Sequence, residues 1–307
     1  MQEKIEILLA TYNGEKYIKQ LLDSIVAQTY TNWIIRVGDD SSTDGTYDIL
    51  LQYKDMYPEK FIIEKNVPGT GSAKVNFFQL MKKSTCKYVM CCDQDDIWLP
   101  HKIELTYHEM KKIEERDIPV LVHSDIKVVD ADLNVMSNSF FDYSHYKRQF
   151  GYKDLLIQNF VTGCTMMMNR SLVQLVNLEE AYDNILMHDW IAALLAAGCG
   201  KIGFVHEPTM LYRQHSVNSV GAKQYGFKLF LQKLANQSLK KSVQNTARQA
   251  EQLAKTYALQ LDEELVKLTK TYATIFDMNK IKRGYFCLKH GILKHGMARI
   301  ICQLLFC

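Results

Sequence analysis

The first hundred residues alternate between two patterns of apolar positions. One pattern is a short continuous apolar run with the length of a buried strand, and it occurs at 5–9, 33–37, 61–63 and 87–92. The other recurs every three or four residues, as in a helix, and its first instance is Tyr17, Ile18, Leu21, Leu22, Ile25 and Val26. Strands that alternate with helices predict an α/β fold whose mostly parallel sheet is flanked by helices.

The remaining two thirds of the chain continue this pattern and then change. Helices are expected at 100–116 and 188–198, and strands at 120–123, 161–169, 201–205 and 209–212. From residue 226 onward the pattern is mostly that of amphipathic helix, and its first apolar row is Phe227, Phe230, Leu231 and Leu234. We therefore expect one domain over 1–220 and a helical C-terminal region over 221–307.

Polar residues crowd the ends of the first four predicted strands, at 10–13, 39–44, 66–71 and 93–96. In parallel sheets, ligands bind beyond the carboxyl ends of the strands. The fourth loop holds Asp93, Asp95 and Asp96, and carboxylates are ligands that suit Mg²⁺ or Mn²⁺. If the chain is extended there, Asp93 and Asp95 point to the same side. The alternative is a solvated turn in which an aspartate caps the following helix.

Three further segments carry candidate binding groups. Asp40, with Asp39 beside it, can accept the N3–H of uracil or thymine, and Tyr12 can stack on that ring; turn chemistry is the alternative. The PGTG segment that precedes Lys74 can approach a phosphate through its glycines. It lacks the third glycine of a dinucleotide-binding motif, so binding of NAD by an oxidoreductase is a weak alternative.

Two segments late in the predicted domain carry candidate catalytic groups. Asp189 opens a helix, where the helix dipole favours an ionised carboxylate that can act as a general base. Arg213 and His215 follow a strand; either can contact phosphate, and neutral His215 can bind a metal. A helix cap and a surface loop are the respective alternatives.

Composition restricts the class of protein. A net charge of +3 gives no reason to expect nucleic acid as a partner. The eight cysteines are scattered without a CxxC pair, which is typical of reduced thiols in the cytosol. No signal peptide opens the chain and no apolar run is long enough to cross a bilayer, so we expect a cytoplasmic protein.

The C-terminal region is basic, with 14 Lys and Arg against 5 Asp and Glu from residue 226 onward. Apolar residues lie at helical spacing among these cations, at Ile281, Tyr285, Leu288 and Ile292, and the chain ends on the apolar stretch 300–306. Such a mixture predicts peripheral contact with the inner face of the cell membrane. The alternatives are a helix packed on the catalytic domain or an oligomer contact.

Taken together, these segments resemble the family 2 glycosyltransferases, which have the Rossmann-like, nucleotide-sugar-binding GT-A fold. The resemblance covers about residues 5–220 and rests on LLATYNGEKYIKQLLDSIVAQTY, VGDDSSTDGT, CCDQDDIWLP, MHDW and YRQHSVNS, which occur in the family's order. It implies an inverting sugar transfer from a nucleoside diphosphate sugar, with Mn²⁺ or Mg²⁺ as cofactor and no enzyme nucleophile.

The resemblance also implies roles for individual residues. Tyr12 and Asp40 would hold the base with Asp39 beside them, and Lys74 and Arg213 are further candidates for donor binding. Asp93 and Asp95 would be the D-x-D pair, Asp95 in direct metal contact and Asp93 near the ribose and metal. His215 would lie near the diphosphate and metal, and Asp189 would be the catalytic base. Other residue types occupy the place of Asp96 in the family.

Within the family, CDQDDIW, QNFVTGCTMMMNR, HDW and YRQHSVNSVG look most like bacterial rhamnosyltransferases of cell-surface polysaccharide assembly. The resemblance then implies dTDP-L-rhamnose as donor and a saccharide as acceptor. If that acceptor is lipid-linked, a C-terminal region bound to the membrane would suit it. Because Asp40 can pair with thymine or uracil alike, a UDP-hexose donor is an alternative. A non-catalytic nucleotide-sugar-binding protein on the same fold is another; it would tolerate loss of Asp189.

Overall fold

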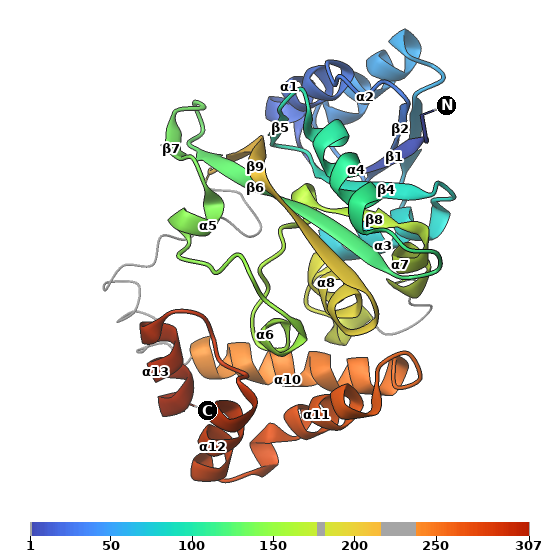
Figure 1. The fold of residues 1–307 in the computed structure, drawn as a ribbon. Helices are drawn as coiled ribbons and strands as arrows, with labels where there is room; N and C mark the ends of the chain where they lie inside the picture. Colours follow the sequence, from blue (N-terminus) through green and yellow to red (C-terminus); the bar gives the residue numbers. More distant parts are fainter. Residues whose placement is uncertain (1, 177–181, 216–237, 307) are drawn as a thin grey trace. The chain divides into compact units, whose positions relative to one another are not determined.

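A computed structural model describes residues 2–176, 182–215 and 238–306 (Figure 1). Within these residues the chain forms two compact units, the first built from 1–140, 161–178 and 201–222 and the second from 141–160, 179–200 and 223–307. This division differs from the single boundary expected at residue 220. Two segments from the middle of the chain join the C-terminal helices, and one of them carries Asp189.

The first unit begins with four parallel strands, in the order β3-β2-β1-β4. They are β1 (Ile5–Thr11), β2 (Trp33–Asp39), β3 (Phe61–Lys65) and β4 (Tyr88–Asp93), as the four apolar runs predicted. The helices between them are α1 (Glu15–Val26), α2 (Thr46–Met56) and α3 (Ala73–Lys83). The predicted apolar face of α1 is buried, which fixes this helix on the sheet and sets the loops at the strand ends.

Beyond β4 the sheet is mixed. The short strand β8 (Met167–Asn169) runs antiparallel to both β4 and β6 (Val120–Val129), and β9 (Lys201–Arg213) is parallel to β6. β5 (Ile97–Trp98) and β7 (Val135–Ser137) pair antiparallel with β9 and β6, and α4 (Lys102–Ile113) and α7 (Arg170–Val176) complete the unit. Two expectations were wrong in detail. The run 161–169 includes the 3₁₀ turn η1 (Gly163–Thr165) before β8, and 201–213 is one strand.

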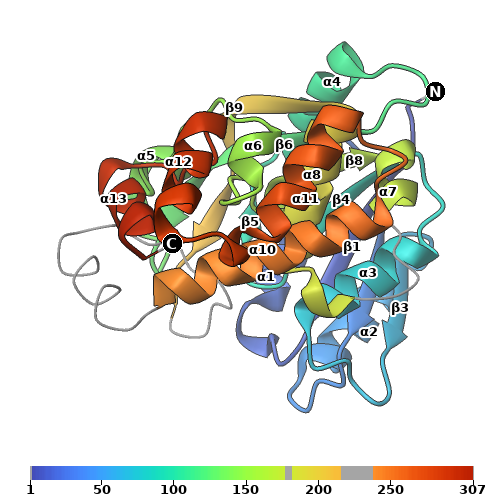
Figure 2. The ribbon, with the colours of Figure 1, turned by 90° about the horizontal axis from the view of Figure 1, so that it is seen from below.

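The second unit is helical, as expected for the C-terminal region (Figure 2). Its elements are α6 (Tyr152–Leu155), η2 (Tyr182–Asn184), α8 (His188–Cys199), α10 (Ser238–Thr256), α11 (Glu263–Ala273), η3 (Ile275–Asp277), α12 (Lys280–His290) and α13 (Met297–Phe306). The short α5 (Phe140–Tyr143) lies where the chain passes from the first unit to the second. The apolar row expected at 227–234 lies outside the described residues. No helix among the described residues is long and apolar enough to span a membrane.

Hydrogen bonds explain why α6 and α8 group with the C-terminal helices. The Tyr152 hydroxyl lies 2.7 Å from the Thr269 hydroxyl of α11, and Trp190 Nε1 of α8 donates to the Leu155 carbonyl of α6 at 2.6 Å. α8 is apolar around nearly its whole circumference, and eight of its residues are buried. A helix of this kind requires neighbours on several sides.

His123 in the first unit and His188 in the second are fully enclosed, and both are expected to make stability depend on pH. Burial lowers the pKa of His123 in β6 and of His188 in α8 from 6.5 to about 3. The unfolded chain therefore takes up protons below pH 6.5 that the folded chain does not bind until near pH 3. The free energy of unfolding should fall over this window by about 1.4 kcal/mol per pH unit for each histidine.

Urea unfolding at pH 7.5 and pH 5 measures this effect. We expect His123→Asn to remove about half of the loss in stability between the two pH values. His206→Asn, at an exposed position of β9, should leave the loss as in the wild type. An equal loss in the His123→Asn and wild-type proteins would show that His123 is protonated in the folded state.

Candidate active site

The loops that follow β1 and β4 are joined by one side-chain amide. Gln94 accepts from the Tyr12 backbone N–H and donates to the Tyr12 carbonyl, both at 2.9 Å. Gly14 allows this approach, because a Cβ at that position would lie 2.4 Å from Gln94 Oε1. The Tyr12 side chain itself is 57% exposed, so its ring is accessible for stacking on a planar ligand.

The loops that follow β1 and β2 are also joined. Asn13 has a left-handed backbone (φ 47°), which asparagine tolerates well, and its N–H donates to Ser42 Oγ at 3.0 Å. The Gly14 N–H donates to Thr46 Oγ1 at 2.7 Å. Asp39 is fully buried and accepts from the Ser42 hydroxyl at 2.5 Å. Asp39 thus fixes the turn next to Asp40, the residue expected to bind the nucleobase.

Asp40 holds the loop that follows β3. Its carboxylate accepts from the Thr70 N–H at 2.6 Å, the Thr70 hydroxyl at 3.0 Å, the Gly71 N–H at 2.9 Å and Asn66 Nδ2 at 3.2 Å. A carboxylate has about four acceptor positions, so a nucleobase N–H has to replace one of these donors. Lys74 follows in the first turn of α3, partly buried.

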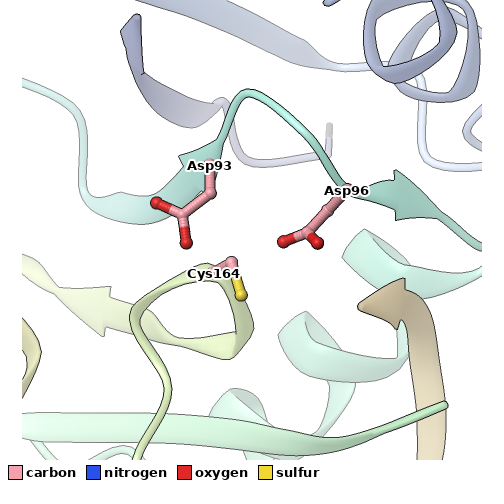
Figure 3. Close-up of side chains that lie close together, drawn as sticks. All are labelled: Asp93, Asp96 and Cys164. Carbon is pink, nitrogen blue, oxygen red and sulfur yellow. The ribbon is translucent and has the colours of Figure 1, made fainter. Parts of the chain in front are cut away.

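The Asp-rich segment is a turn and not the extended chain expected for the D-x-D spacing. Asp93 ends β4, and Gln94 and Asp95 form the turn. In this turn Asp96 lies beside Asp93. The ligand atoms of Asp93, Asp96 and Cys164 all lie within 4.8 Å of one another, and the two carboxylates face each other above Cys164 (Figure 3).

Burial and neighbouring carboxylates act on the titratable groups of this cluster. Burial, together with the charges of Asp95 and Asp93, raises the pKa of Asp96 well above its usual range. Burial, together with the charges of Asp96 and Asp93, raises the pKa of the Cys164 thiol. Lys102 is a buried cation nearby, and burial lowers its pKa to about 8. Hard carboxylate oxygens that repel each other are a donor set that fits Mg²⁺ or Mn²⁺.

Asp95 faces the chain segment that follows β9. Its Oδ2 lies 2.8 Å from His215 Nε2, and both side chains are largely buried. The His215 ring stacks on Tyr17 of α1 with 4.9 Å between ring centroids. Of the three predicted metal ligands, Asp95 and His215 therefore contact each other, and Asp93 lies beside Asp96, which was not among the predicted ligands.

Arg213 holds the Asp-rich turn through hydrogen bonds to its backbone and to Asp96. Its Nε donates to the Asp95 carbonyl at 3.0 Å, while the two terminal nitrogens donate to the Ala131 carbonyl at 2.8 Å and to Gln20 Oε1 at 2.6 Å. Its backbone N–H donates to Asp96 Oδ1 at 3.2 Å. The side chain was expected to contact the donor. Because all three guanidinium nitrogens bond to protein acceptors and the residue is buried, its geometry is that of a positioning residue.

Replacement of Arg213 by Lys tests this role. Lysine keeps the charge but lacks the planar fork that reaches three acceptors. We expect the donor Kd to rise at least about tenfold, because lost hydrogen bonds from a charged group cost about 1.5–3 kcal/mol each. Arg170→Lys is the matched control, since Arg170 donates to the Ser84 carbonyl at the other end of β4. Wild-type donor affinity in Arg213→Lys would contradict the positioning role.

Asp189 lies in the second unit, in the first turn of α8. It is buried, and its Oδ1 accepts from Asn159 Nδ2 at 3.1 Å. Trp190, the next residue, is fixed by its bond to the Leu155 carbonyl. The carboxylate thus has a defined orientation, as a general base requires.

Three residues of these sites were missed in the sequence. Gln94 lies between Asp93 and Asp95 in the sequence. That position was the only indication in the sequence that Gln94 belongs to the site. Lys102 sits in the first turn of an amphipathic helix, where a lysine usually faces solvent. Asn159 lies in a segment without a clear period, thirty residues before its partner Asp189.

Comparison with known proteins identifies the family. Residues 6–176 match the model described as glycosyl transferase family 2. The chain is 30% identical over 227 residues to the dTDP-rhamnosyl transferase RfbG of Shigella flexneri, covering 70% of this chain and 74% of RfbG. It is 25% identical over 206 residues to the glucosyltransferase WfgD of Escherichia coli, whose name gives UDP-Glc as donor and α-D-GlcNAc-diphosphoundecaprenol as acceptor, covering 64% and 74%.

Two solved structures share the fold. The TarS 1–349 complex with UDP-GlcNAc, from S. aureus, has a TM-score of 0.56 and 14% identity over 99% of this chain and 90% of TarS 1–349. The mannosyltransferase PcManGT of Pyrobaculum calidifontis, solved with GDP-Man and Mn²⁺, has a TM-score of 0.57 and 13% identity over 95% and 74%. The fold is therefore of the GT-A type, and the chain belongs to the family 2 glycosyltransferases.

Proposed function

We propose that this glycosyltransferase is inverting and metal-dependent, and that it transfers L-rhamnose from dTDP-L-rhamnose to a hydroxyl of a growing cell-surface polysaccharide or lipid-linked saccharide. The observation that carries the proposal is the aspartate cluster at the carboxyl end of β4, within a fold shared with nucleotide-sugar-bound enzymes. The rhamnose donor is supported by the similarity to RfbG.

The base of the donor would bind between Tyr12 and Asp40. The exposed ring of Tyr12 offers a stacking surface, and the Asp40 carboxylate accepts an N–H once one of its present donors, such as the Thr70 hydroxyl, gives way. Lys74 follows the Asp40-bound loop and would supply positive charge toward the diphosphate. Arg213 would act through the turn that it holds.

The metal would be held by Asp93, Asp95 and His215, with Asp96 as a further carboxylate beside Asp93. A bound divalent cation supplies charge neutralisation for the diphosphate leaving group. The fit rests on the donor set, three carboxylates and an imidazole in adjoining positions; burial, and then the charges of Asp95 and Asp93, raise the pKa of Asp96 there.

Asp189 is the proposed general base. Its carboxylate takes the proton of the acceptor hydroxyl as that oxygen attacks the anomeric carbon and the bond to the diphosphate oxygen breaks. The nucleoside diphosphate leaves from the opposite face, so a single displacement inverts the anomeric centre. Asn159 keeps the carboxylate aimed through its 3.1 Å hydrogen bond.

A second candidate is a UDP-hexose transferase, which the similarity to WfgD favours. The two are separated by measuring nucleoside diphosphate release from dTDP-rhamnose, UDP-glucose and UDP-galactose in the presence of Mn²⁺. Faster release of dTDP supports the rhamnosyltransferase, and faster release of UDP assigns the hexose donor. Binding of a donor without any release, with saccharide acceptors present, favours the non-catalytic alternative.

The acceptor is proposed to be lipid-linked, with the protein at the inner face of the cell membrane. WfgD, as its name states, acts on a diphosphoundecaprenol-linked sugar. The C-terminal helices of this chain carry the basic and apolar residues that contact with such a membrane requires.

A further inference from the structure

Two adjacent helices at the C-terminal end expose rows of apolar side chains. On each helix the exposed residues recur every three or four positions, so they lie on one face. They are Ile281, Tyr285 and Leu288 of α12 and Met297, Ile301 and Leu305 of α13. Their exposed fractions run from 45% for Ile301 to 84% for Ile281. We call these six residues the apolar rows.

Other faces of the same helices hold them in the second unit. Phe286 and Cys287 of α12 are buried, and so is Gln303 of α13. The Gln303 amide donates to the Ile292 carbonyl at 2.8 Å and accepts from the Lys294 N–H at 2.7 Å. The helices are therefore fixed through their inner faces, and the apolar rows remain outside this packing.

The two helices are also neighbours. A Cβ added at Gly284 of α12 would lie 3.8 Å from Leu304 Cδ2 of α13, an ordinary van der Waals distance, so the two helices lie side by side there. Gly284 lies beside the row of α12, and Leu304 lies beside the row of α13. The two rows thus border one helix contact and can act as one surface.

The charged residues of the segment that carries the apolar rows are of one sign. Residues 280–307 contain six Lys and Arg and no Asp or Glu. Lys280, Lys282 and Lys289 are exposed on α12 itself, beside its apolar row. Lysines next to a membrane can extend their charged ends toward the head groups while apolar neighbours enter the acyl boundary.

We propose that the apolar rows and these three lysines form a docking surface for an anionic lipid bilayer. The charge pattern favours this occupant, because the exposed lysines of α12 match a negative lipid surface, and Tyr285 is a residue type enriched at membrane interfaces. The inference deepens the proposed function by naming the membrane-contacting surface, and it rests on that function only for the lipid-linked acceptor.

Cosedimentation of the full chain with lipid vesicles tests the proposal. The vesicles consist of phosphatidylcholine alone or of phosphatidylcholine mixed with phosphatidylglycerol. We expect binding to the anionic vesicles only. The triple variant Ile281→Ser, Tyr285→Ser, Leu288→Ser should weaken it about 100-fold. Lys280→Gln, Lys282→Gln and Lys289→Gln should each weaken it about fivefold, an effect that added salt reduces.

Leu259→Ser is the matched control, because Leu259 is an exposed leucine of the same unit outside the surface. It should bind vesicles as the wild type does. Circular dichroism and calorimetric binding of the nucleotide sugar, measured on every variant, separate loss of vesicle binding from loss of folding or of donor binding. If the wild-type protein bound the nucleotide sugar but did not bind anionic vesicles, the proposed membrane-docking surface would be wrong. The proposed transferase function would be unaffected by that result.

Two other outcomes would also overturn the proposal. Vesicle binding that the triple variant retains would place the contact elsewhere in the chain. A wild-type dimer in light scattering that the triple variant converts to a monomer, without vesicle binding, would assign the apolar rows to a second copy of the chain.

Discussion

Asp189→Asn is expected to lower kcat by about a thousandfold, because a positioned general base contributes roughly 10²–10⁴ to the rate. The amide is nearly the same size as the carboxylate but cannot accept the proton of the acceptor hydroxyl. Donor affinity should change by less than about twofold, since the proposed role of Asp189 concerns the acceptor. Asn159→Ala should lower kcat by about tenfold, as it releases the orientation of the carboxylate and leaves its charge.

Steady-state rates of nucleoside diphosphate release, together with donor titration, measure these effects. Asp183→Asn is the matched control, because it makes the same chemical change at an exposed position of the second unit. If Asp189→Asn kept more than about a tenth of the wild-type kcat, Asp189 would be only a residue of the first turn of α8 and not the base.

Asp93→Asn is expected to abolish the metal-dependent part of donor binding. Sites of this kind bind the cation through one or two carboxylates and the phosphates of the substrate, so neutralising one carboxylate removes a large share of the site. The corresponding loss in kcat/KM is about a thousandfold. Because Asp93 is paired with Asp96 in the structure, the variant should also relieve their repulsion and fold at least as stably as the wild type.

This combination of lost function and retained stability is the distinctive part of the prediction. Thermal unfolding without metal should give an equal or higher Tm for Asp93→Asn, whereas Asp48→Asn, at an exposed position of α2, should affect neither Tm nor donor binding. A variant that binds donor with the wild-type dependence on Mn²⁺ would remove Asp93 from the metal site.

The first half of the fold and its loop cluster could be predicted because parallel strands impose their own geometry. Once the four apolar runs are adjacent parallel strands, their carboxyl ends share one edge, and the loops that follow must meet. The hydrogen bonds that the Tyr12 N–H donates to Gln94 and the Thr70 N–H donates to Asp40 join these loops. Helix α3 begins directly after Ser72, whose hydroxyl accepts from the Val75 N–H.

The rest depended on partners that local patterns do not specify. β8 is three residues long, which is too short for a pattern of apolar and polar positions to identify it as a separate strand. Such a pattern also does not show whether a strand runs parallel or antiparallel to its neighbours. The D-x-D spacing suggested an extended chain, whereas Gln94 and Asp95 form a turn that brings Asp96 beside Asp93. The positive charge of Arg213 suggested contact with a phosphate of the donor. In the structure its guanidinium donates to the Asp95 carbonyl and so holds the backbone of the Asp-rich turn.

The C-terminal region shows the same limit. Ile281, Tyr285, Leu288 and Ile292 share a helical spacing in the sequence, yet the first three are exposed and Ile292 is buried beyond the end of α12. Spacing shows that residues share a face and does not show what covers it. The exposed fractions and the surrounding charge supply that information here.

The most direct test of the central claim is a calorimetric titration of the purified protein with dTDP-rhamnose, with and without Mn²⁺, beside UDP-glucose and Asp95→Ala. The proposed function predicts binding of dTDP-rhamnose that requires the metal, exceeds that of UDP-glucose and is lost in the variant. Absence of nucleotide binding under every condition would contradict it, and would leave the aspartates of the Asp-rich turn without a role in donor recognition.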